Sequence, residues 1–109
     1  MKHIKIGGHK IKITHEPDKD NDGYFSTDKN QINISPNITK TRAGVTLIHE
    51  ALHAVNPTFD DHTNGHALLC SLAEQIYQVL EDNKLLSDKF YKICTVKSVT
   101  KTSKKKPNI

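Results

Sequence analysis

The stretch Lys40–Val55, KTRAGVTLIHEALHAV, decides how this 109-residue chain folds. Its apolar residues recur at intervals of three and four, at Val45, Ile48, Leu52 and Val55. This spacing predicts an amphipathic helix that buries one face. Thr39 or Thr41 can cap the first turn, and Pro57 prevents the helix from continuing.

The same helix carries the sequence His-Glu-x-x-His, formed by His49, Glu50 and His53. Residues four apart lie one turn apart on the same helix face, so both imidazoles can bind one metal ion. Glu50 can then act as general base on a metal-bound water. The plainer alternative is a helix with two partly exposed histidines, and we favour the metal site.

A catalytic zinc site usually takes three protein ligands and leaves a fourth position for water. The chain therefore needs a third ligand beyond the first helix. The residues downstream that can supply it are Asp60, Asp61, His62, His66, Cys70 and Glu74. We expect most of them to lie in or just before a second helix, over residues 65–82.

Helix geometry separates these candidates. Counting about 100° per residue from His66, the apolar face of the second helix centres about 80° away. That face consists of Leu69, Leu72, Ile76 and Leu80. His66 therefore lies at its edge, and the interval from His53 suits a short loop followed by an antiparallel helix.

Glu74 lies about 160° from the centre of that face and is expected to point to solvent. Its spacing from His53 nevertheless resembles that of the glutamate ligand in thermolysin-like enzymes. We favour His66 as third ligand and keep Glu74, His62 and Asp61 as alternatives. Cys70 is interpreted as a small buried residue. Imidazole donors with an open position favour Zn²⁺ as the metal.

The first third of the chain predicts short strands. Isoleucines alternate with polar residues on both sides of Gly7-Gly8, which suits a tight hairpin. A second hairpin is expected from residues 24–26 into 31–35. Together these elements predict an α+β fold, with a small antiparallel or mixed sheet packed on two main helices. A short helix from Ser87 and a strand over residues 91–99 are expected to follow.

We expect residues 1–86 to form one domain and residues 87–109 an extension with a disordered tail. Lysines crowd this tail, at Lys97, Lys101, Lys104, Lys105 and Lys106. They could contact the phosphates of nucleic acid, but no aromatic residues stand among them, so we do not favour this. No apolar run is long enough to span a membrane. Two cysteines make no disulfide framework, which favours a cytoplasmic protein.

The stretch from Thr46 to Val55, with the hairpins before it and the second helix after it, resembles the small phage-type zincin metallopeptidases. These are related to the SprT-like and ImmA/IrrE groups, and the resemblance covers about residues 1–84. It implies a zincin core in which an edge strand holds the substrate, and the cytoplasm of a host cell if the chain is phage-encoded. It also implies that His49 and His53 are ligands and Glu50 the general base.

The resemblance is looser at the third ligand. Many such proteins have acidic residues where the second helix begins, whereas this chain has Gly65-His66-Ala67. These three residues are more similar to the corresponding residues of the SprT-like enzymes, which favours His66 as the third ligand. Tyr24 or Tyr77 could stabilise an oxyanion as zincin tyrosines do, although packing is the simpler role for both.

The sequence thus predicts a zinc metallopeptidase that acts on a peptide or protein. The alternative is a non-catalytic zinc-binding module, or a regulatory protein, whose basic tail binds nucleic acid or a partner.

Overall fold

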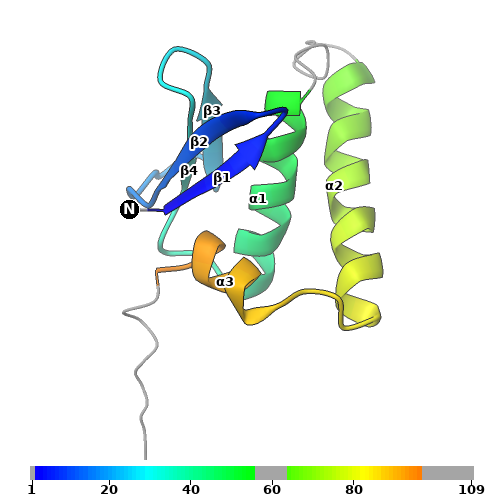
Figure 1. The fold of residues 1–109 in the computed structure, drawn as a ribbon. Helices are drawn as coiled ribbons and strands as arrows, with labels where there is room; N and C mark the ends of the chain where they lie inside the picture. The colour runs from blue at the N-terminus through cyan, green and yellow to red at the C-terminus, as the bar shows by residue number, and fades with distance from the viewer. Residues whose placement is uncertain (1, 56–63, 97–109) are drawn as a thin grey trace, which may run out of the picture.

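Four strands and three helices make up the described part of the chain, residues 2–55 and 64–96, in this computed structural model (Figure 1). The strands are β1 (Lys2–Ile6), β2 (His9–Thr14), β3 (Gly23–Ser26) and β4 (Gln31–Ile34). The helices are α1 (Lys40–Val55), α2 (Asn64–Asp82) and α3 (Asp88–Cys94). The predicted α+β class is confirmed, with a small mixed sheet packed on two main helices.

The strands lie in the order β1-β2-β4-β3. Both predicted hairpins are present, β1 with β2 and β3 with β4, each antiparallel. Gly7 and Gly8 form the first turn with φ angles of 57° and 83°, a region that glycine enters without steric cost. The two hairpins join through a parallel pairing of β2 with β4. This order leaves β3 at an edge of the sheet.

A buried asparagine holds the chain in place where it leaves β2. The Oδ1 atom of Asn33 accepts hydrogen bonds from the Thr14 hydroxyl and from the Glu16 backbone N–H, both at 2.8 Å. Its Nδ2 atom donates to the Glu16 carbonyl at 3.0 Å. Because its polar atoms have these partners, Asn33 can be buried without a large desolvation cost.

Helix α1 lies between the sheet and α2 (Figure 1). Of the two predicted caps, Thr39 acts as one, since its Oγ1 atom accepts a hydrogen bond from the Arg42 backbone N–H. The main core lies between the sheet and α1, and α3 also contributes to it. Its buried residues are Ile11, Ile13, Ile32, Ile34, Ala43, Leu47 and Cys94.

The segment after residue 87 differs from the prediction. Ser87 caps α3 by accepting a hydrogen bond from the Phe90 backbone N–H, as expected for a helix that begins there. The strand predicted from Tyr91 is wrong, because residues 91–94 continue this helix and direct Cys94 into the core. Thus part of the expected extension packs with the rest of the chain. The lysine-rich tail, residues 97–109, lies outside the described residues.

The face that α2 turns toward α1 also differs from the prediction. Its buried residues are Leu69, Ala73 and Tyr77, whereas Leu68, Ile76 and Val79 are exposed. Around the helix axis, at 100° per residue, the mean direction of the three buried residues lies about 20° from His66. The predicted face is centred about 80° from His66. The helix is therefore rotated so that His66 points in nearly the same direction as the buried residues, although its own side chain is exposed.

No helix among the described residues is long and apolar enough to cross a membrane.

Candidate metal centre

Three histidine rings converge between α1 and α2. The ring centroids of His49 and His53 lie 4.8 Å apart, and those of His49 and His66 lie 5.3 Å apart. The rings of His53 and His66 stack at 5.6 Å with an interplanar angle of 16°. The two helices run antiparallel, so the end of α1 lies beside the start of α2 (Figure 1). His53 and His66 are carried by these two ends.

The donor atoms have a spacing that suits a metal. The Nε2 atoms of His49 and His53 lie 3.2 Å apart. Two nitrogens bound to tetrahedral zinc at 2.0–2.1 Å are separated by about 3.3–3.4 Å. Three imidazoles and a nearby thiol are also donors that zinc prefers. The residues present therefore fit a zinc ion.

Glu50 lies beside this cluster and is only 7% exposed. Its Oε2 atom is 4.0 Å from the Nε2 atom of His49. Both residues line the same cavity. A buried carboxylate next to the imidazoles is placed to accept a proton from a group bound in that cavity.

The environment keeps His49 neutral. Burial, followed by the nearby His53 and His66, lowers the pKa of His49 to about 4. Its ring is therefore unprotonated at pH 7. Because only the neutral imidazole binds a metal, the site is ready for one at that pH.

A cavity of about 670 Å³ opens over the three histidines. One wall is made by α1 and α2, and the other by the edge strand β3 with the residues just before it. From β3, Gly23, Tyr24 and Phe25 line the cavity. Within residues 2–55 and 64–96, no strand pairs with the outer edge of β3, and such an edge beside a cavity can pair with an extended peptide.

The rings of His49, His53 and His66 lie close together with Glu50 beside them, but the grouped donor atoms are those of His49, His66 and Cys70, without His53. Glu74 also lines the cavity, although its side chain is exposed and it is not among the grouped donors. His62, Asp60 and Asp61 lie outside the described residues. Glu74 is exposed, as predicted. The rotation of α2 also places it at the rim of the cavity, which was not predicted.

The two tyrosines differ in position. Tyr24 lines the cavity and is half-exposed. Tyr77 is buried, and its hydroxyl lies 2.8 Å from the Tyr91 hydroxyl. Of the two, Tyr24 is the one that can meet a bound substrate.

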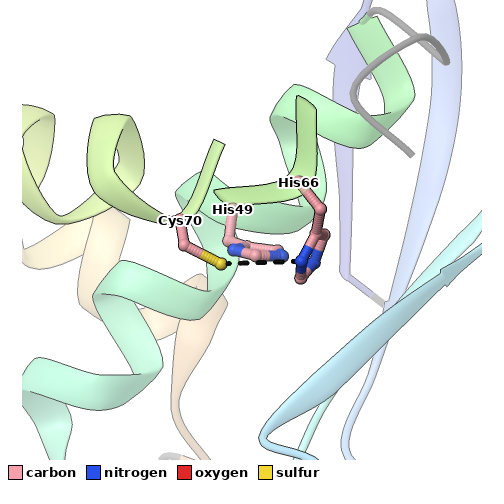
Figure 2. Close-up of side chains that lie close together, drawn as sticks. All are labelled: His49, His66 and Cys70. Carbon is pink, nitrogen blue, oxygen red and sulfur yellow. Dashed lines mark hydrogen bonds between the residues drawn. The ribbon is translucent and has the colours of Figure 1, made fainter. Parts of the chain in front are cut away.

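Cys70 is predicted from the sequence to be a small buried residue, but it is only partly buried and lines the cavity. Its Sγ atom lies 3.8 Å from the Nδ1 atom of His66, and Figure 2 shows it directed toward the two histidines. Donor atoms of His49, His66 and Cys70 all lie within 4.8 Å of one another. The sequence signal for Cys70 as a ligand is its position four residues after His66. The same spacing separates His49 from His53.

Comparison of the chain with protein-family models, with curated proteins and with solved structures found no match.

Proposed function

We propose that this protein is a zinc-dependent metallopeptidase. The observation that carries the proposal is the convergence of His49, His53 and His66 beside the buried carboxylate of Glu50. The resemblance to the small phage-type zincins supports the same reading.

In this proposal the three histidines hold Zn²⁺. A zinc ion held there would supply a Lewis acid and would lower the pKa of a bound water to about 7. Glu50 accepts a proton from the attacking water and later delivers it to the leaving nitrogen. The overall reaction adds water across the peptide bond, so a C–O bond forms at the carbonyl carbon as the C–N bond breaks.

An extended peptide is the substrate that this cavity favours. The open edge of β3 can pair with the peptide backbone, while its carbonyl lies over the histidines. Tyr24, on the same strand, is placed to donate a hydrogen bond to the oxyanion that develops on that carbonyl.

The cellular location is also a proposal. Cys70 and Cys94 are both free thiols, which suits the reducing cytoplasm, that of a host cell if the chain is phage-encoded.

One observation favours the alternative, a zinc module without turnover. Cys70 adds a fourth donor, and sites with four protein ligands are usually structural. A regulatory protein of this fold with little turnover also remains a candidate. Contact with nucleic acid or a partner protein through the basic tail would belong to either alternative.

The discriminating experiment is cleavage of a peptide library by the zinc-loaded full chain, read by mass spectrometry. Glu50→Gln should retain zinc and lose cleavage by a factor of about 10² or more. The matched control is Glu81→Gln, an exposed glutamate of α2 that does not line the cavity, which should cleave like wild type. No cleavage by wild type or by Cys70→Ala, which removes the fourth donor, would favour the non-catalytic module if one zinc is bound per chain.

A further inference from the structure

Helices α1 and α2 each present a pair of metal-binding side chains at the same spacing. On α1 the pair is His49 and His53, and on α2 it is His66 and Cys70. In each pair the residues are one helical turn apart and lie on one face. The helices are antiparallel (Figure 1), and Figure 2 shows His66 and Cys70 of α2 beside His49 of α1. The donor atoms of His49, His66 and Cys70 lie within 4.8 Å of one another, and His53 joins this group through its Nε2 atom, 3.2 Å from that of His49. Cys70 thus adds a donor to the three histidines that the proposed function requires.

The distances place the sulfur within reach of the same ion. Cys70 Sγ is 3.8 Å from His66 Nδ1, and both belong to a donor group with His49 in which no separation exceeds 4.8 Å. A thiolate at 2.3 Å and an imidazole nitrogen at 2.0–2.1 Å from tetrahedral zinc are separated by about 3.5–3.6 Å. The observed separation exceeds this by a few tenths of an ångström, which a small rotation of the Cys70 side chain can close.

The surroundings of Cys70 differ from those of the second cysteine. Cys94 is fully buried in the core, where it donates a hydrogen bond to the Phe90 carbonyl. Cys70 is only partly buried and lines the cavity with the three histidines. Of the two thiols, only Cys70 is therefore exposed to an ion or a reagent in the cavity.

We infer that Cys70 is a fourth protein ligand of the metal and occupies, in the resting protein, the position that solvent would take. This inference rests on the proposed zinc site and deepens it. The resting site is closed by three nitrogens and one sulfur. Peptide hydrolysis then requires the Cys70 thiolate to leave, so the protein is self-inhibited until it does.

The test uses Co²⁺ in place of zinc, because cobalt reports its ligands in the absorption spectrum. The wild-type chain should show visible bands of tetrahedral cobalt and an intense near-ultraviolet band from thiolate-to-cobalt charge transfer. Cys70→Ser should keep the visible bands and lose the near-ultraviolet band. The matched control, Cys94→Ala, should keep both.

The outcomes separate this inference from the proposed function. Visible bands without the charge-transfer band in wild type would overturn the Cys70 assignment and leave the three-histidine site standing. Absence of all cobalt bands in wild type would overturn both.

A second measurement needs no variant, so it does not depend on whether Cys70→Ser folds. Iodoacetamide alkylates a thiolate by forming an S–C bond as iodide leaves, and mass spectrometry tells which cysteine has reacted. In the metal-free chain Cys70 should react, and saturating zinc should slow its alkylation at least tenfold, while Cys94 stays protected in both states. An equal rate at Cys70 with and without bound zinc would contradict the inference.

Discussion

The ring of Tyr77 on α2 packs directly over Gly44 on α1. A Cβ atom added at Gly44 would lie 2.5 Å from Cε1 of Tyr77 and 3.1 Å from Cδ1, and carbon atoms do not approach this closely without a shift. This contact lets α1 and α2 approach one another, and so sets how far His66 lies from the two histidines of α1. A glycine outside the site thus helps to assemble it.

Gly44→Ala tests this dependence. Forcing the two helices apart should destabilise the protein by about 1–3 kcal/mol, the usual cost of overpacking a core. It should also weaken zinc binding, because His66 moves away from His49 and His53. Thermal unfolding and zinc titration measure the two effects, with the exposed Thr41→Ala on the same helix as control. Full zinc affinity in Gly44→Ala would show that the site does not depend on this packing.

The third ligand can be identified by comparing two substitutions on α2. His66→Ala should lower zinc affinity by a factor of 10² or more, since removing a direct ligand costs at least what an outer-shell change does, about 10- to 100-fold. Glu74→Ala should leave zinc stoichiometry unchanged. The measurement is metal content after dialysis against a weak chelator. The reverse pattern, with zinc lost only in Glu74→Ala, would transfer the ligand role to Glu74.

The metal-free protein should lose stability as the pH falls below about 6.5. The pKa of His49 is lowered to about 4 in the folded chain, from 6.5 when unfolded, and the pKa of His15 is also lowered by burial and by Lys2. Between pH 6.5 and pH 4 the unfolded chain binds more protons than the folded chain. The free energy of unfolding therefore decreases as the pH falls through this range. The contribution of unprotonated His49 to the stability of the folded chain is complete above pH 6.5 and is lost as the pH approaches 4.

Urea unfolding of the metal-free chain between pH 4 and 8 measures this effect. His49→Gln should flatten part of the pH dependence, because the group that titrates is removed. The exposed His9→Gln is the control and should follow wild type. If the free energy of unfolding changes equally with pH in wild type and in His49→Gln, the pKa of His49 is not lowered by folding.

Cys70→Ala separates zinc binding from turnover. Loss of the sulfur ligand should weaken zinc binding, yet at saturating zinc it should raise the rate of peptide cleavage because the fourth position is open to solvent. A titration of activity against zinc measures both quantities. Unchanged zinc affinity together with an unchanged rate would mean that Cys70 only packs beside the site.

The sequence predicts α1 and its three site residues because everything needed is local. One cap and one motif lie within a single helix, and a separation of four residues places His49 and His53 on the same face. The apolar repeat indicates the helix but not its buried face, because Val55 is 63% exposed. The buried residues are Ala43, Gly44, Thr46, Leu47 and Glu50. The two hairpins were equally accessible, since alternation and the glycine turn are also local.

The features that the sequence does not predict depend on contacts between residues far apart in the chain. The rotation of α2 goes with the packing of Tyr77 against Gly44 of α1, which buries Ala73 and leaves Leu68 and Val79 exposed. A rule that buries the leucines and isoleucines therefore predicts the wrong face, and with it the wrong environment for Cys70, which lines the cavity. The parallel pairing of β2 with β4 is likewise invisible in the alternation of either strand.

The central claim is that His49, His53 and His66 bind one divalent ion, and calorimetric titration of the metal-free full chain with Zn²⁺ tests it most directly. The account predicts one zinc per chain with a Kd below about 1 μM, and loss of that binding when His49 and His53 are both replaced by alanine. The exposed pair His3 and His9, replaced in the same way, should leave the binding unchanged. Failure of the wild-type chain to bind zinc, or equal binding by the two double variants, would contradict the account.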